Sequence, residues 1–164
     1  MKKRTVLSLI LTLTMLMLAL SVCVSPQQAE AADKLVLTDT TNFSIETYRS
    51  YLYCTTTGVT AQGLKDVFSG QNTKVFNSSG NEMADTSRIT TGTQIRLMGS
   101  YAALDVLTVI IGGDVDGNGL VNNTDLTVLK AALKSSSITL KPENVTAGDA
   151  NRSGKLTVTE YLML

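Results

Sequence analysis

The chain has 164 residues, with 14 basic and 14 acidic side chains, two cysteines and no histidine. The absence of histidine excludes Ser-His-Asp and Cys-His catalytic groups and the usual zinc ligand sets, and the balanced charge does not favour nucleic-acid binding. Catalysis by paired carboxylates stays open, but the acidic residues cluster in loops and a small β-rich segment offers little room for a cleft, so we expect no enzyme.

The N-terminus has the pattern of a secretory signal. Basic residues at positions 2–4 precede an apolar run over residues 6–24, and Ala29-Glu30-Ala31 offers a small-residue cleavage site. We predict a signal peptide over residues 1–31, and therefore a secreted, extracellular protein with no stable membrane insertion after cleavage. A retained N-terminal anchor and lipidation at Cys23 are the alternatives.

Cleavage there leaves 11 basic and 13 acidic residues, a net charge of −2, and Cys54 as the one remaining cysteine. No internal disulfide can then form, so stability must come from a core or from bound metal. The simplest role for Cys54 is a buried thiol, because no histidine is present to activate it.

Residues 32–112 are rich in Thr, Ser and β-branched side chains, which predicts a small β-dominated α+β module. One helix is expected after a Thr60 cap, with Leu64, Val67 and Phe68 on one face and Gly70 at its end. The candidate strands are residues 34–37, 50–54, 73–76, 93–98 and 106–111.

Turn residues at 77–81 and 91–93 predict chain reversals between these strands. Four tyrosines, Tyr48, Tyr51, Tyr53 and Tyr101, admit two interpretations: ordinary packing on a sheet, or a surface on which sugar rings stack. A glycan is therefore a possible ligand of this module.

The most informative segment begins directly after the last expected strand. Residues 114–125, DVDGNGLVNNTD, place oxygen donors at the spacing of a twelve-residue calcium loop, with Gly119 at the sharp bend that needs a positive φ. The donors at positions 1, 3, 5, 7, 9 and 12 are Asp114, Asp116, Asn118, the Leu120 carbonyl, Asn122 and Asp125. A helix with Leu126, Leu129 and Leu133 on one stripe should follow.

The same pattern returns in residues 149–160, DANRSGKLTVTE. Its donors would be Asp149, Asn151, Ser153, the Lys155 carbonyl, Thr157 and Glu160. Val121 and Leu156 occupy position 8 of the two loops and could pair with each other. A single such cluster could be a plain turn, but the repetition of donors, glycine and apolar position predicts two bound Ca²⁺ ions.

The segments GDVDGNGLVNNTDLTVLKAAL and GDANRSGKLTVTEYLML together resemble a type I dockerin. The resemblance implies an all-α domain over residues 113–164, built from two calcium loops that are each followed by one helix without a leading helix. It also implies a partner, the cohesin module of a scaffold protein in a polysaccharide-degrading, cellulosome-like assembly.

Family contacts at positions 10 and 11 and in the following helix map to Asn123, Thr124 and Lys130 in the first unit, and to Val158 and Thr159 in the second. Because these positions differ between the repeats, we expect docking mainly through the first unit. Residues 32–112 resemble small β-rich modules that precede dockerins in secreted proteins of anaerobic bacteria, a likeness that implies no activity.

The expected function is a secreted adaptor that docks through calcium-ordered helices. Two rival interpretations are a calcium-stabilised structural protein of the cell surface, and a module over residues 34–111 that binds glycans or a protease and is carried by the dockerin.

Overall fold

The computed structural model describes residues 33–135 and 138–163. The predicted signal peptide over residues 1–31 lies outside the described residues. Asp33–Leu164 form one compact unit. Within the described ranges, no helix combines the length and apolar character needed to cross a bilayer.

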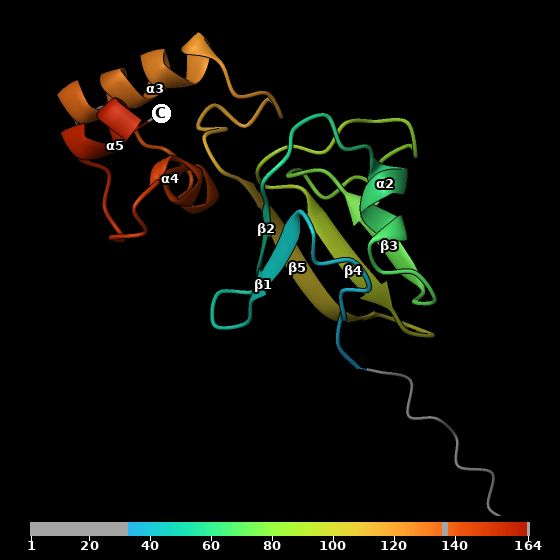
Figure 1. Ribbon diagram of the computed structural model, residues 1–164. Helices are drawn as coiled ribbons and strands as arrows, with labels where there is room; N and C mark the ends of the chain where they lie inside the picture. Colours follow the sequence, from blue (N-terminus) through green and yellow to red (C-terminus); the bar gives the residue numbers. More distant parts are fainter. Residues whose placement is uncertain (1–32, 136–137, 164) are drawn as a thin grey trace, which may run out of the picture. The chain divides into compact units, whose positions relative to one another are not determined.

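A mixed five-stranded sheet forms the N-terminal half of this unit (Figure 1). Its order is β1-β2-β5-β4-β3, with β2 and β5 parallel and all other neighbours antiparallel. The strands are β1 (Phe43–Glu46), β2 (Tyr51–Cys54), β3 (Thr73–Phe76), β4 (Gln94–Met98) and β5 (Ala103–Ile111). Four of these five strands coincide closely with predicted ones.

The strand predicted at residues 34–37 is wrong, and β1 takes its place. Leu35 is buried, but its N–H donates to the Asp105 carboxylate at 2.8 Å, and the Val36 N–H donates to the Gln71 side chain at 3.2 Å. This backbone is therefore satisfied largely by side chains instead of a strand ladder. The apolar pattern correctly predicted a buried residue, but not a strand.

Helix α2 (Ala61–Asp66) begins as predicted at Thr60, whose side chain accepts a hydrogen bond from the Gly63 N–H at 3.1 Å. Leu64 and Phe68 are fully buried against the sheet. The turn at 91–93 is also present, with Gly92 at φ 90°.

Replacing Thr60 with alanine should lower the free energy of unfolding by about 1 kcal/mol, because the helix loses the acceptor for one of its unpaired N–H groups. Urea denaturation monitored by circular dichroism measures the change. Thr57→Ala, at an exposed position in the preceding loop, serves as the control, and a loss of equal size there would contradict a capping role.

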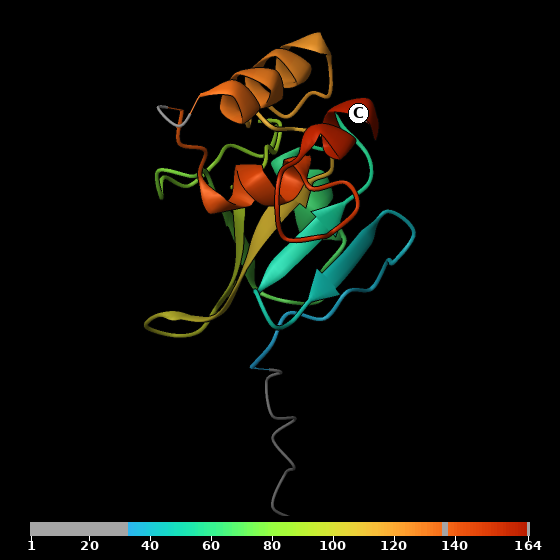
Figure 2. The ribbon, with the colours of Figure 1, turned by 90° about the vertical axis from the view of Figure 1, so that its left-hand side faces the viewer.

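The two faces of the sheet are covered by different parts of the chain. Alternate residues of β5, such as Leu107 and Val109, belong to the main core on the α2 side. Ile110 is equally buried but points to the other face, which α4 (Pro142–Gly148) covers. Figure 2 shows α4 and α2 on opposite sides of the sheet. Cys54 is 2% exposed within the main core, as expected of a buried thiol.

The C-terminal region, residues 113–163, contains α3 (Asn123–Lys134), α4 and α5 (Val158–Met163). Loops take up much of the rest of its described residues, so the region is helical only in part and is not clearly the all-α domain that the resemblance implied. Its own small core includes Val115, Leu129 and Ala147. Leu126 and Leu133 are half-buried, in agreement with the predicted stripe.

Helix α4 was not predicted, and it gives the second loop a leading helix. Pro142 begins it and Glu143 lies in its first turn, both of which favour a helix start. The first loop follows strand β5, so the expectation of loops without a leading helix is correct for the first loop alone.

Candidate functional site

The first candidate metal loop bends at Gly119, with φ 81°, as its sequence predicted. The Gly119 N–H lies 3.1 Å from both oxygens of Asp114, which is fully buried. The Asn118 N–H and side-chain amide both donate to Asp116, at 3.0 and 2.6 Å. These bonds wrap the loop around the carboxylates at positions 1 and 3.

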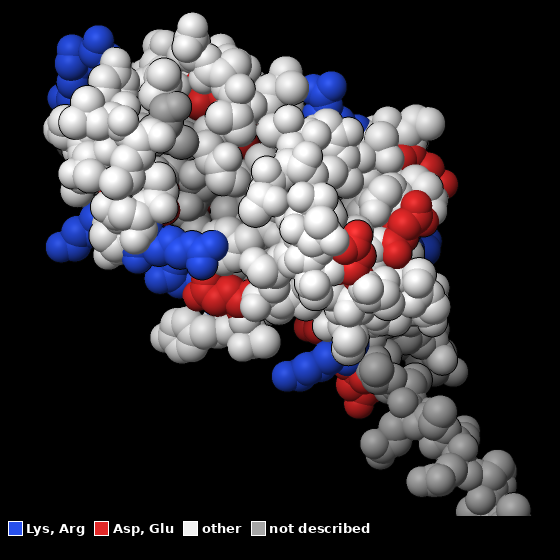
Figure 3. Space-filling view, viewed as in Figure 1, with Lys and Arg blue, Asp and Glu red and all other residues white. Residues whose placement is uncertain are grey.

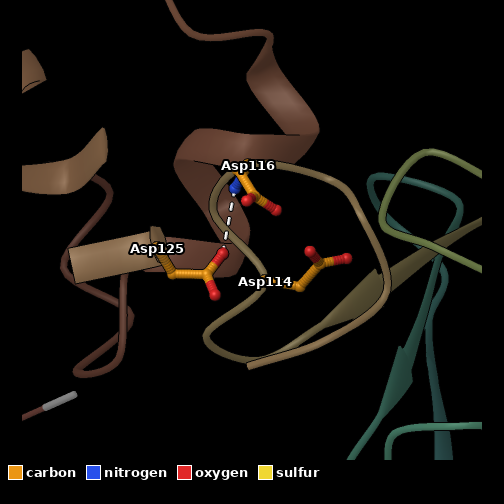
Figure 4. A group of neighbouring side chains, drawn as sticks. All are labelled: Asp114, Asp116 and Asp125. Atoms are coloured by element: carbon orange, nitrogen blue, oxygen red, sulfur yellow. Dashed lines mark hydrogen bonds between the residues drawn. The ribbon is translucent and has the colours of Figure 1, made fainter. Parts of the chain in front are cut away.

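The last carboxylate of this loop comes from the start of α3. Asn122 and Asp125 form a capping box, in which the Asn122 N–H donates to the Asp125 carboxylate at 2.9 Å. The other Asp125 oxygen accepts from the Asp116 N–H at 3.1 Å, the bond drawn in Figure 4. The capping residues that start the helix therefore also place the position-12 carboxylate.

Together these constraints bring Asp114, Asp116 and Asp125 into one cluster. Their ligand oxygens all lie within 4.8 Å of one another, and Asp114 and Asp125 are buried. Burial, with the neighbouring charges of Asp125 and Asp114, raises the pKa of Asp116. Three carboxylates that crowd each other in this way suit a hard divalent cation, which would neutralise their repulsion.

The second loop repeats this arrangement with fewer charges. Asp149 accepts from the Ser153 N–H at 2.9 Å and the Gly154 N–H at 2.6 Å. One Glu160 oxygen accepts from the Thr157 N–H and hydroxyl, at 2.7 and 2.6 Å, and the hydroxyl bond holds the pKa of Glu160 below its usual value.

The other Glu160 oxygen, Oε1, is buried and has no hydrogen-bond partner among the described residues. A buried carboxylate oxygen without a partner is costly. A cation in the second loop would give this oxygen a ligand role, so the residues present fit the metal that their spacing predicted.

The segment that contains both loops is similar to a known domain family. Residues 112–164 match the dockerin type I domain. Dockerin domains generally bind calcium and dock onto cohesin modules, in assemblies of the cellulosome type, and proteins that carry them are typically extracellular. No curated protein and no solved structure matches the chain.

The predicted contact residues of the dockerin region are accessible. Asn123, Thr124 and Lys130 on α3, and Val158 and Thr159 on α5, are all exposed. Their role in docking stays a prediction. At position 8, Val121 is 45% exposed and Leu156 is half-buried near Gly148, so the pairing of these two side chains also stays a prediction.

The tyrosines of the N-terminal module do not share one flat surface. Tyr51 and Tyr53 lie edge to face, with ring planes at 87°, and the Arg152 guanidinium covers Tyr53 at 4.6 Å from the ring centre. Tyr48 and Tyr101 project from two different turns. On the face seen in Figure 3, basic and acidic side chains are interspersed on a mainly uncharged surface.

Residues from outside the two loops also contact the site, and no motif in the sequence predicts these contacts. The Thr91 N–H donates to Asp114 at 2.8 Å, and the Asn144 side chain donates to the Val115 carbonyl at 2.9 Å. The partners are separated by 23 and 29 residues, so no local pattern could reveal them.

Proposed function

We propose that the chain is a secreted, non-catalytic adaptor that binds two calcium ions and docks through its dockerin region onto a cohesin module of a scaffold protein. In this role it would place the N-terminal module within a polysaccharide-degrading assembly. The observation that carries the proposal is the pair of loops, one with three clustered carboxylates and the other with a buried, unpartnered Glu160 oxygen.

In the first loop, Asp114, Asp116 and Asp125 would hold the ion, with Asn118 and the Leu120 carbonyl as further oxygen donors. In the second loop, Asp149 and Glu160 would supply the charge, with neutral oxygens from Asn151, Ser153 and the Lys155 carbonyl completing the donors. Each ion would fix the start of the helix that follows its loop, because the position-12 carboxylate lies in the first turn of that helix.

Isothermal titration with calcium, followed by titration of the calcium-loaded chain with a panel of cohesin modules, tests the proposal. Two ions per chain and one cohesin partner are expected. Uptake of two ions without binding to any cohesin would favour the rival structural role, while uptake of less than one ion at millimolar calcium would contradict both.

Docking through the first unit can be tested at position 11. Thr124→Asp should weaken cohesin binding at least tenfold, about 1.4 kcal/mol, because an unpaired charge would be buried in the interface. Folding should be preserved, since Thr124 is exposed and an acidic residue near a helix N-terminus is favourable. Calcium titration of the variant should match that of the unsubstituted chain.

The matched control is Thr159→Asp, at the same position of the second unit and equally exposed. We expect little change there. Helix α5 exposes Val158, Leu162 and Met163, which offers apolar contact area of its own. A larger loss with Thr159→Asp than with Thr124→Asp would therefore assign docking to the second unit.

A further inference from the structure

The first metal loop is closed by a segment of the N-terminal module, residues 88–91. The Thr91 N–H lies 2.8 Å from Asp114 Oδ2, so one oxygen of the position-1 carboxylate is oriented by an amide from outside the loop. Thr91 is itself fixed, because its hydroxyl accepts from the Ile111 N–H at 3.1 Å. All three residues are buried.

The same segment packs against the bend of the loop at Gly119. A Cβ atom on Gly119 would lie 2.6 Å from the Ile89 carbonyl oxygen and 3.2 Å from side-chain atoms of Arg88 and Thr90. Position 119 therefore needs glycine for two reasons: its φ of 81° and this close approach of the neighbouring backbone. The atoms that lie against Gly119 belong to the β-rich module.

Among the described residues, no segment of the module lies against the glycine of the second loop. Gly154 occupies the same position with the same φ of 81°, yet a Cβ atom there would meet nothing within 4 Å. The carboxylate at its position 1, Asp149, accepts hydrogen bonds from its own loop, at Ser153 and Gly154. The second loop also touches the module: the exposed Arg152 side chain lies over Tyr53, and Asp149 and Arg152 line a pocket with Glu46 and Arg49. Among the described residues, none of these contacts is a hydrogen bond to the position-1 carboxylate.

We propose that residues 88–91 are an integral part of the first calcium site, with Thr91 as a positioning residue for Asp114. A group that holds a metal ligand in place through a hydrogen bond raises the affinity for the metal. The coupling free energy is reciprocal, so metal binding stabilises the position of that group by the same amount. Calcium in the first loop therefore stabilises the β-rich module, and the folded module strengthens calcium binding, whereas the second loop binds its ion without this support. The inference rests on calcium binding by the first loop but not on cohesin docking.

Gly119→Ala and Gly154→Ala form a matched pair for the test, because both introduce the same backbone strain and only the first adds the collision with Ile89. The variants are made in the chain from residue 32 onward and titrated with calcium by calorimetry. We expect Gly119→Ala to weaken one site by on the order of tenfold to a hundredfold, and Gly154→Ala to weaken the other site clearly less.

Hydrogen exchange of the unsubstituted chain provides a readout that depends on no variant. The Thr91 amide should exchange more slowly with calcium than without it, at a calcium concentration that fills the first site. Equal losses in the two glycine variants, together with a Thr91 amide that is insensitive to calcium, would overturn the inference while leaving calcium binding intact. Failure of the unsubstituted chain to take up calcium would instead overturn the proposed function.

Discussion

Removing calcium with a chelator is expected to abolish most of the helical order in residues 113–163 and all binding to a cohesin module. The ligand oxygens of Asp114, Asp116 and Asp125 lie within 4.8 Å of one another. At that separation, two like charges repel by about 3 kcal/mol at an effective dielectric constant of about 20. The dockerin region buries few apolar residues, so hydrophobic burial offsets little of this repulsion. Binding of the ion would therefore supply folding free energy.

Far-UV circular dichroism of the chain, recorded with calcium and with chelator, measures this change, and a cohesin pull-down under the same conditions measures docking. The sheet should persist, because its core, which includes Leu52, Leu64 and Ile95, lies outside the dockerin region. Restoring calcium should recover both signals. An unchanged spectrum in chelator would contradict the dependence of the helices on metal.

The second large effect is expected from substitution of the position-1 ligands. Asp114→Ala and Asp149→Ala should each remove calcium uptake at one site, and Asp114→Ala should weaken cohesin binding by tenfold or more beyond the loss caused by Asp149→Ala. Asp114 is fully buried and carries bonds from Gly119 and Thr91, and its loop precedes the longer helix α3. Calorimetric titration with calcium and then with cohesin gives both quantities.

Asp39→Ala is the control for loss of an acidic residue, because Asp39 lies outside both loops and is exposed. It should alter neither titration. Equal weakening of docking by Asp114→Ala and Asp149→Ala would contradict docking mainly through the first unit, and would indicate that either unit serves equally.

The sequence predicted well those elements whose signals are local. The start of helix α2 follows from the Thr60 cap, although the helix ends at Asp66, before Val67 and Phe68. Strands β3 and β4 follow from short apolar stretches between turns. The strand predicted at residues 34–37 is wrong because an apolar pattern indicates burial of Leu35 but not backbone pairing, and the Leu35 N–H donates to the Asp105 side chain. Helix α4 was missed because its seven residues lack an apolar stripe.

The metal loops were predictable for a similar reason, since a twelve-residue spacing is a local code. The bend at Gly119 and the clustered carboxylates both follow from it, whereas Asn122, expected only as a metal donor, also caps helix α3. The contact between Thr91 and Asp114 was not predictable, because it depends on how a sheet and a loop meet after folding. For the same reason, the sequence does not predict that α4 covers the second face of the sheet, to which Ile110 points.

Cys54 gives the chain a property that matters in an oxidising medium. It lies in the core of the sheet, its Sγ contacts the Thr56 carbonyl at 3.1 Å, and burial raises its pKa. An accessible lone thiol would join two copies of the chain or form adducts with small thiols. In this position the thiol is inaccessible to oxidants while the sheet stays folded. Folding of the sheet therefore prevents cross-linking of two copies through Cys54.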